Sequence, residues 1–311
     1  MKLLILGAGA IGGYFGGRLA ESGAEVTFLV RPRRREQLER DGLRVESPLG
    51  DLALRVNTVA ADEVRPGYDL VLLTCKAYDL DAAMDAIAPA MDGRCSVLPM
   101  LNGFAHFARL DDRFGPTRVL GGTCALSVTL RTDGTIRHVG ERQRMVFGER
   151  APCRGGPSAR TAEFAMLLAG TKIDWEESSN IEQDLWEKIV VLSALAAVTC
   201  LFRATIGEVM RSPGGPATIE RALRTNTEVA TREGFPPRAA ATEFARKALL
   251  DPASGLTASM LRDLEGGAQV ESDHIVGWML DHARRHAIDD TVLSMAFTSL
   301  KAYEARRSPP A

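Results

Sequence analysis

The residues with the clearest capacity for chemistry stand at the start of the chain, where the spacing G-x-G-x-x-G spans residues 7–12 directly after an apolar run. A buried strand that turns through glycines into a helix presents backbone N–H groups and the positive end of the helix dipole to a phosphate. In this pattern the first glycine allows a tight turn, the second lets a pyrophosphate approach, and the third lets the helix pack closely. We therefore expect a dinucleotide to bind at Gly7, Ala8, Gly9, Ala10, Ile11 and Gly12.

An arginine directly after the next expected strand, at residues 25–30, indicates which dinucleotide is bound. NAD sites usually carry Asp or Glu at this position, to accept a hydrogen bond from the ribose 2′-hydroxyl. Arg31 stands there instead, and its guanidinium suits a 2′-phosphate that a carboxylate would repel. We therefore predict NADPH or NADP as the cofactor, with Arg31 at the 2′-phosphate. The arginines at residues 33–35 fit either further phosphate contacts or the solvated start of a helix.

Two polar side chains follow other expected strands in the same way. Lys76 comes after the apolar run at residues 69–74, and Asn102 comes after the run at 96–101. Ligands of open parallel sheets bind outside the carboxyl ends of the strands, so both residues are candidates for the site. The alternatives are a surface lysine in a loop and, for Asn102-Gly103, an ordinary turn.

The second half of the chain offers a lysine and two carboxylates. Lys188 directly precedes the uncharged stretch at 189–202, where a lysine on the margin of a core helix is usually a snorkelling surface group. Glu271 and Asp273 would stand about 200° apart on a helix, so at most one of them would face a given cleft. Their alternative role is to favour the dipole of a helix N-terminus.

The elements that must position these residues change character along the chain. Residues 1–177 alternate between strand and helix patterns and include a hairpin whose turn lies at 132–135, so we expect a Rossmann-like doubly wound parallel sheet. Residues 178–311 are helical in pattern, so we expect an all-α domain that carries substrate and catalytic residues. The protein is thus predicted to be α/β in its first half and all-α in its second. The expected helices of the second domain are 181–211, intact or broken near 203–207, and 214–233, 238–250, 259–286 and 290–306.

Composition excludes several classes of function. The chain has 311 residues, of which 45% are hydrophobic and 25% are charged, and its net charge of −2 gives no footprint for nucleic acid. Its five cysteines are scattered and lack metal-ligand spacing, so we expect reduced thiols, no metal and no disulfide framework. The stretch at 189–202 is too short to span a bilayer, and the first strand is too short for a signal peptide. We expect a cytoplasmic enzyme without a membrane partner.

Motifs along essentially the whole chain, taken in order, resemble the ketopantoate reductase (2-dehydropantoate 2-reductase) family. The glycine turn is shared by many oxidoreductases, whereas the lysine after Trp186-Glu187 combined with the later Ser-Met…Asp…Glu-x-Asp segment is far more specific. The matching segments are Gly7–Gly13, Arg31, Thr74–Tyr78, Leu101–Gly103, the hairpin Asp133–Gly140, Leu185–Lys188, Ser259–Asp263 and Glu271–Asp273.

The resemblance implies hydride transfer from NADPH to the ketone of a 2-oxo acid, with ketopantoate as the leading substrate and pantothenate biosynthesis as the setting. By the family pattern Lys188 is the general acid that protonates the nascent alkoxide, and Glu271 hydrogen-bonds the substrate. Asn102 and Ser259 hold substrate, and Asn102 also borders the cofactor. Lys76 lies beside both nicotinamide and substrate.

The sequence also departs from the family. The family commonly has asparagines four and eight residues after the lysine, where this chain has Leu192 and Ala196 on the same helical stripe as Lys188. It often has Arg and Thr shortly before the glutamate, where this chain has Ala268 and Val270. A site without these hydrogen-bonding groups loses preference for a substrate hydroxyl, so we expect a more apolar pocket.

Three alternatives to ketopantoate reduction therefore stay open: a reductase of a less polar 2-oxo acid, a dehydrogenase of another small hydroxy acid, and an NADP(H)-binding regulator without turnover. The sequence also leaves the oligomeric state open, with a homodimer as one outcome.

Overall fold

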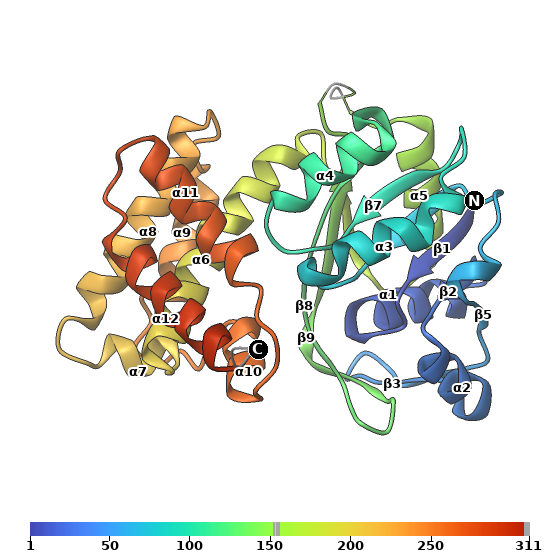
Figure 1. Cartoon of the computed structure of the whole chain (residues 1–311), viewed down its shortest axis with the longest axis horizontal. Coiled ribbons are helices and arrows are strands. Elements are labelled where there is room, and N and C mark those ends of the chain that lie inside the picture. The colour runs from blue at the N-terminus through green and yellow to red at the C-terminus, as the bar shows by residue number, and fades with distance from the viewer. Residues whose placement is uncertain (152, 154–155, 308–311) are drawn as a thin grey trace. The chain divides into compact units, whose positions relative to one another are not determined.

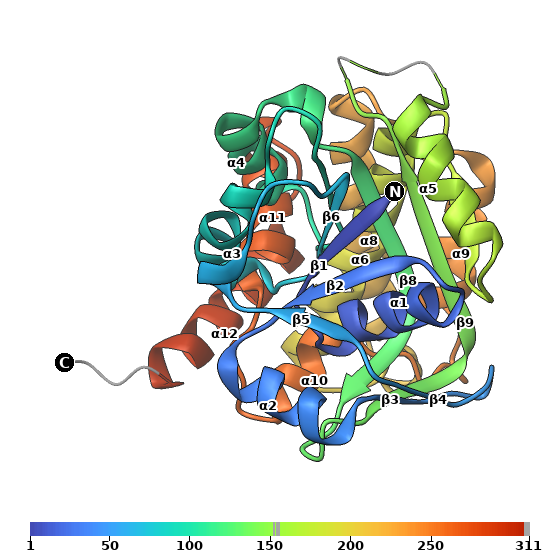
Figure 2. The same ribbon diagram turned by 90° about the vertical axis from the view of Figure 1, so that its right-hand side faces the viewer.

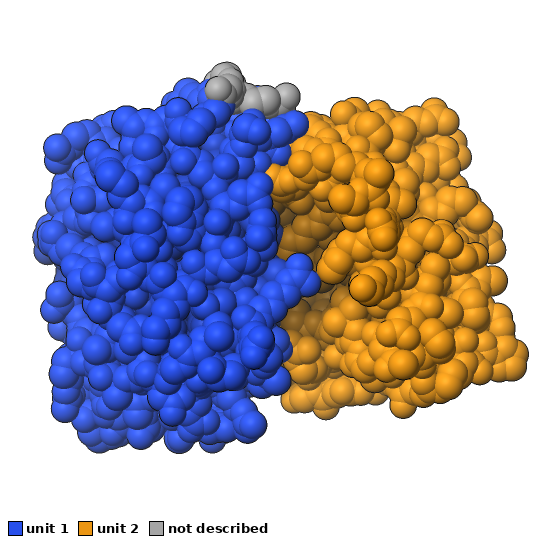
Figure 3. All heavy atoms as spheres, turned by 180° about the vertical axis from the view of Figure 1, so that it is seen from behind, with its two compact units in different colours: residues 1–101, 106–182 blue, residues 102–105, 183–311 orange. Residues whose placement is uncertain are grey.

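The computed structural model describes residues 1–151, 153 and 156–307 (Figures 1 and 2). The chain divides into two compact units, which Figure 3 distinguishes by colour. The first unit consists of residues 1–101 and 106–182, and the second of residues 102–105 and 183–311. The sequence placed the boundary between residues 177 and 178, and it gave no sign that residues 102–105 group with the helical unit.

The first unit contains a five-stranded, all-parallel sheet, which confirms the predicted Rossmann-like fold. The chain starts in the middle of this sheet and winds outward in both directions, in the strand order β5-β2-β1-β6-β7. In β1, Leu6 pairs with Leu29 of β2 and with Leu73 of β6, so the residues after these strands emerge at the same edge. The strands are β1 (Lys2–Leu6), β2 (Glu25–Leu29), β5 (Asn57–Val59), β6 (Leu70–Leu73) and β7 (Ser96–Pro99).

A second sheet in the same unit contains the predicted hairpin, whose turn at Asp133-Gly134 is closed by a 2.9 Å hydrogen bond from Arg131 N to Thr135 O. The strand order is β10-β9-β3-β4, and β8 pairs with β9 in antiparallel fashion. The sequence predicted the hairpin, but it did not predict that the other short strands join it in a separate sheet. The strands are β3 (Leu43–Glu46), β4 (Leu52–Leu54), β8 (Gly121–Leu130), β9 (Ile136–Gly148) and β10 (Asp174–Glu177).

The first helix, α1 (Ala10–Glu21), lies between the two sheets and contacts strands of both. A Cβ at Gly16 would collide with the Phe28 ring of the parallel sheet, and a Cβ at Gly17 would press on Leu52 of the second sheet. Glycines therefore allow this helix to approach both sheets closely, and its buried face shares one core with them. The remaining helices are α2 (Pro32–Asp41), α3 (Leu80–Ile87), α4 (Ala105–Phe114), which the sequence did not predict, and α5 (Ala159–Ala169).

The regular secondary structure of the second unit is entirely helical over the described residues, as predicted. The break expected near 203–207 occurs at Arg203, whose φ of 50° is left-handed and ends α6. The helix predicted over 259–286 is interrupted instead, because Gly266 caps α10 and Gly267 adopts a φ of 71°. The elements are α6 (Ile181–Phe202), α7 (Ile206–Met210), α8 (Gly215–Arg232), α9 (Ala239–Leu249), α10 (Ser259–Glu265), a π-helical turn (Asp273–Gly277), α11 (Trp278–Arg285) and α12 (Thr291–Arg307).

Helix α6 is long and apolar enough to cross a membrane by length and composition alone. However, 67% of its most apolar window is buried within the structure, and side chains from Trp186 to Cys200 form part of the core of the second unit. This burial is typical of the central helix of a water-soluble bundle.

Candidate functional site

The glycine turn after β1 has the geometry of a phosphate cradle. Gly7 has a φ of 94°, which only glycine adopts without strain, and its N–H donates to Leu29 O at 2.9 Å. A Cβ at Gly12 would overlap both the Gly7 carbonyl oxygen and Thr74 Oγ1, whereas a Cβ at Gly9 would meet no protein atom within 4 Å. Gly12 therefore serves the packing of α1, and Gly9 borders open space.

The N-terminus of α1 is arranged to receive an anion. Gly9 is its N-cap and supplies no side-chain acceptor, and no acidic residue occupies the first turn. The first turn of α1 consists of Ala10, Ile11 and Gly12. Its backbone N–H groups thus have no side-chain cap and lie at the positive end of the helix dipole.

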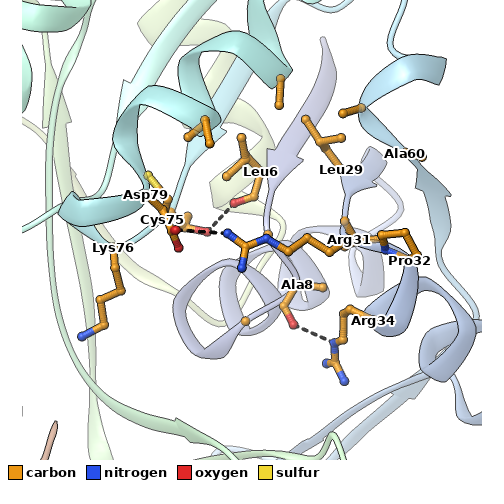
Figure 4. Close-up of a pocket in the computed structure, with 18 of the residues that line it drawn as sticks. Leu6, Ala8, Leu29, Arg31, Pro32, Arg34, Ala60, Cys75, Lys76 and Asp79 are labelled. Atoms are coloured by element: carbon orange, nitrogen blue, oxygen red, sulfur yellow. Dashed lines mark hydrogen bonds and ion pairs between the residues drawn. The ribbon is translucent and has the colours of Figure 1, made fainter. Parts of the chain in front are cut away.

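A pocket of about 680 Å³ opens beside this turn, within the first unit (Figure 4). This volume is in the range of cofactor and ligand sites. Of the predicted cofactor residues, Gly7, Ala8, Gly9, Arg31 and Lys76 line the pocket. Ala10, Ile11 and Gly12 begin the adjoining helix and are not among the described lining residues.

Arg31 is the N-cap residue of α2 and reaches across the pocket toward Asp79 (Figure 4). Its Nη2 lies 3.1 Å from Asp79 Oδ1, and its side chain is 78% exposed. No pattern in the sequence indicated this carboxylate, which lies in the short turn after Lys76. Asp62 lines the same pocket, so two carboxylates share it with the three cations Arg31, Arg34 and Lys76.

The later arginines have different environments. Arg34 lines the pocket and donates from Nε to Ala8 O at 3.0 Å and from Nη1 to Gly134 O at 3.1 Å. Burial, with the nearby charge of Arg44, lowers the pKa of Arg34. Arg35 instead forms ion pairs with Glu39 and Glu63. Arg34 therefore anchors the glycine turn to the β8–β9 hairpin.

Lys76 directly follows the β6 edge and is the N-cap of the short turn Ala77–Asp79. Its side chain is half-buried and extends away from Arg31 (Figure 4). The pocket thus has Arg31 on one side and Lys76 on another, and it lies beside the uncapped N-terminus of α1. These donors fit a dinucleotide that carries several negative charges.

The second unit carries Lys188 on α6, next to a carboxylate that is already neutralised. Arg238 donates to Glu187 from Nε at 2.7 Å, from Nη2 at 2.6 Å and from its backbone N at 2.9 Å. Burial opposes ionisation of Glu187, but these hydrogen bonds prevail and hold its pKa below its ordinary value. Lys188 itself is half-buried.

The stripe below Lys188 is apolar in the structure. Leu192 is half-buried and packs against the core of the second unit, and Ala196 is a fully buried member of that core. Polar side chains that would hold a hydroxylated substrate are therefore absent at both positions.

Ser259 is the first residue of α10, and the residue before it contacts α6 at Thr199. The N–H of the preceding Ala258 lies 3.4 Å from Thr199 Oγ1, which in turn donates to Leu195 O. Ser259 thus begins its helix near the Ala196 end of the stripe. Thr199 lies about 16 Å from Lys188 along the axis of α6.

Glu271 is only 6% exposed and lies outside any helix, just before the π-helical turn. The sequence placed it within a long helix opposite Asp273, and the interruption after α10 overturns that arrangement. Asp273 binds Lys301 of α12 at 3.0 Å, and Ser272 donates to Glu304 on the same helix. Insertions of this π type are frequent at functional sites.

Asn102 is half-buried and belongs to the segment that groups with the second unit. The next residue, Gly103, has a φ of 84°, and a Cβ there would overlap the carbonyl oxygen of His274 in the π-helical turn. The backbone that follows Asn102 is therefore in close contact with the segment that follows Glu271.

Comparison with known proteins identifies the family. The ketopantoate reductase PanE/ApbA model matches residues 3–152, and the model of the C-terminal domain of the same family matches residues 180–304. The chain belongs to the ketopantoate reductase family. It is thus an NADP-dependent oxidoreductase that acts on CH–OH groups, and the cofactor of the family is NADPH.

Individual relatives agree with this membership. The chain is 33% identical to the uncharacterized oxidoreductase YkpB of Bacillus subtilis, over 99% of this chain and 100% of that protein. It is 31% identical to a 2-dehydropantoate 2-reductase of Halobacterium salinarum, over 93% and 94% of the two chains. The crystal structure of a PanE/ApbA family ketopantoate reductase from Ralstonia eutropha superposes with a TM-score of 0.87 at 26% identity, over 99% of each chain.

The same fold also occurs in a D-mandelate dehydrogenase solved with NADH and anilino(oxo)acetate, with a TM-score of 0.86 at 20% identity over 99% of each chain. At this identity the likeness concerns the fold alone. The described residues contain no group of three or more His, Cys, Asp or Glu that could hold a metal, and all five cysteines are free thiols.

Proposed function

We propose that this family member reduces a 2-oxo acid to the corresponding 2-hydroxy acid with NADPH, and that ketopantoate is the first substrate to test. The observation that carries the proposal is Lys188, a half-buried ammonium at the head of an apolar helical stripe, whose neighbouring carboxylate is engaged by Arg238. An ammonium in this setting stabilises charge that develops on a carbonyl oxygen.

When bound, NADPH supplies a hydride to the carbonyl carbon. In the proposed mechanism Lys188 Nζ hydrogen-bonds the carbonyl oxygen and gives it a proton as the C–O π bond breaks, so ketone, hydride and proton become the alcohol. Glu271 accepts a hydrogen bond from the substrate, while Asn102, Ser259 and Lys76 hold its polar groups. Gly7–Gly12 and Arg31 hold the cofactor phosphates.

A second candidate, a 2-oxo acid with an apolar branched side chain, is favoured by Leu192 and Ala196. A hydroxyl placed against two aliphatic side chains would lose its hydrogen bonds with water and gain none from the protein. The two candidates share the mechanism and differ only in the group that faces this stripe.

Steady-state rates of NADPH oxidation with ketopantoate and with unhydroxylated branched 2-oxo acids distinguish them. A kcat/KM for ketopantoate at least ten times higher supports the first candidate, and the opposite order supports the second. Lys188→Ala should reduce turnover by about 10²- to 10⁴-fold and leave NADPH affinity unchanged. If the wild type binds NADPH tightly and reduces no 2-oxo acid, the protein is a nucleotide-binding regulator and the proposal fails.

The proposal includes a cytoplasmic location, where NADPH and small 2-oxo acids are available. A homodimer is included because a fold neighbour, a ketopantoate reductase of Staphylococcus aureus, is described as dimeric. Light scattering of the purified protein tests this state directly.

A further inference from the structure

The segment that carries Asn102 is held by a cluster of aromatic rings that the proposed mechanism does not use. Phe104 lies two residues after Asn102, and its ring centroid is 5.0 Å from that of Trp186 and 5.1 Å from that of Trp278. The Phe104 and Trp278 rings are stacked at 12°, and the two indoles lie 5.2 Å apart. Each ring therefore contacts the other two.

The two tryptophans stand beside the proposed catalytic groups. Trp186 is two residues before Lys188 on α6, and Trp278 directly follows the π-helical turn that begins after Glu271. Trp186 is 5% exposed, so the ring against which Phe104 packs is fixed in the core of the second unit. The ring cluster thus joins three segments, each of which carries one proposed site residue.

A backbone contact reinforces the same attachment. Gly103 approaches the His274 carbonyl more closely than any residue with a side chain could, in a left-handed conformation. Asn102 is therefore followed by one residue that contacts the π-helical turn and by another that packs against two tryptophans.

Aromatic pairs of this kind contribute beyond the area that they bury, and positioning of a reacting group is sensitive to shifts of about 1 Å. We propose that Phe104 is a positioning residue, which holds the Asn102 amide in register with Lys188 and Glu271 by packing against both Trp186 and Trp278. This inference rests on the proposed 2-oxo acid reduction. The residues that line the pocket beside the glycine turn belong to the first unit, whereas Phe104 and both tryptophans belong to the second, so kcat should respond more than NADPH affinity.

A matched pair of variants tests the proposal. Phe235 also stacks on Trp186, at 5.7 Å and 16°, but it lies outside the 102–105 segment. Phe104→Ala and Phe235→Ala thus each remove one phenyl ring from the same indole. We expect Phe104→Ala to lower kcat by about 10- to 100-fold with little change in NADPH affinity, and Phe235→Ala to lower the melting temperature without this loss of kcat. Equal loss of kcat in both variants would show that the rings serve general packing and would overturn the proposal.

A double-mutant cycle identifies the residue through which Phe104 acts. If Phe104 positions Asn102, then Phe104→Ala in the Asn102→Ala background should cost less than threefold in kcat. An undiminished cost in that background contradicts the proposal. Phe104→Leu, which keeps apolar bulk, replaces Phe104→Ala in the cycle if the alanine variant does not fold.

Backbone hydrogen exchange separates this inference from the proposed function. Exchange at residues 102–105 should accelerate at least tenfold in Phe104→Ala and stay unchanged in Phe235→Ala, whether or not a 2-oxo acid is turned over. If the wild type lacks turnover, the proposed function fails, but hydrogen exchange still reports whether Phe104 holds residues 102–105 against the two tryptophans. Unchanged exchange in Phe104→Ala overturns the positioning role by itself.

Discussion

The guanidinium of Arg31 lies 3.1 Å from the carboxylate of Asp79 inside the cofactor pocket, so the cation assigned to the 2′-phosphate is already paired. Both side chains are substantially exposed, at 78% and 38%, and such pairs contribute only about 0.2–1 kcal/mol. A phosphate offers the guanidinium shorter, charge-assisted and bidentate hydrogen bonds. The pair is therefore weak enough for a 2′-phosphate to displace it, at a small cost in affinity.

Asp79→Asn should remove this competition and tighten NADPH binding by up to about fivefold, because about 1 kcal/mol of ion pairing and repulsion is relieved. NADH lacks the 2′-phosphate, so its affinity should change less. Fluorescence titration with both cofactors measures the difference. Asp62→Asn is the matched control, because it removes a pocket carboxylate that does not pair with Arg31. Weaker NADPH binding in Asp79→Asn would mean that Asp79 orients Arg31 rather than competing for it.

Two glycines of the same turn should respond oppositely to a methyl group. Gly9→Ala adds a Cβ where no protein atom lies within 4 Å, so the variant should fold with a melting temperature near that of the wild type and lose NADPH affinity by at least tenfold. Gly12→Ala places its Cβ on the Gly7 carbonyl and on Thr74, and should lower the melting temperature. Thermal unfolding and cofactor titration of both variants check this. A Gly9→Ala variant that binds NADPH normally would refute the role assigned to Gly9.

Local patterns in the sequence were sufficient for the parallel sheet and the glycine turn. The apolar run at 70–73 is fully buried in β6, and the turn at Asp133-Gly134 closes the hairpin as its residue types require. An apolar run and a turn are both set by residues that are adjacent in the sequence. They can therefore be predicted from a single sequence.

Features that depend on distant residues could not be predicted. The pairing of Arg31 with Asp79 joins the start of α2 to the turn after β6, and no local pattern indicates it. Residues 102–105 group with the helical unit, in which Phe104 contacts the distant rings at 186 and 278. The interruption before Glu271, where Gly266 caps α10 and Gly267 adopts a φ of 71°, was not predicted.

Leu192→Asn should shift substrate preference toward a hydroxylated 2-oxo acid. An amide four residues after Lys188 would offer a hydrogen bond on the same helical stripe, and such contacts change discrimination by about tenfold or more. The measurement is the ratio of kcat/KM for ketopantoate to that for an unhydroxylated branched 2-oxo acid. Val191→Asn introduces the same amide at a neighbouring half-buried position, about 100° around the helix, and should leave the ratio unchanged. Equal shifts in both variants would show that Leu192 does not face substrate.

Glu187→Gln should destabilise the protein at neutral pH and lose this effect in acid. The hydrogen bonds from Arg238 hold the folded-state pKa of Glu187 below its ordinary value of 4.5, so the unfolded chain binds its proton first as the pH falls. The stability that the charged form contributes is therefore full above about pH 5.5 and declines as the pH falls through the folded-state pKa. Because Arg238 is 58% exposed, we expect a difference of about 1 kcal/mol at pH 7.

Denaturant unfolding of wild type and Glu187→Gln between pH 3 and 8 measures this difference, which should narrow steadily below the ordinary carboxyl pKa. Glu228→Gln is the control, since its pair with Arg232 is long, at 3.5 Å, and exposed on both sides, and it should cost little at any pH. A difference for Glu187→Gln that stays constant down to pH 3 would show that the side chain stabilises the helix by packing rather than by its charge. The kcat of Glu187→Gln at pH 7 then reports whether the hydrogen bonds between Arg238 and Glu187 also affect the catalytic role proposed for Lys188.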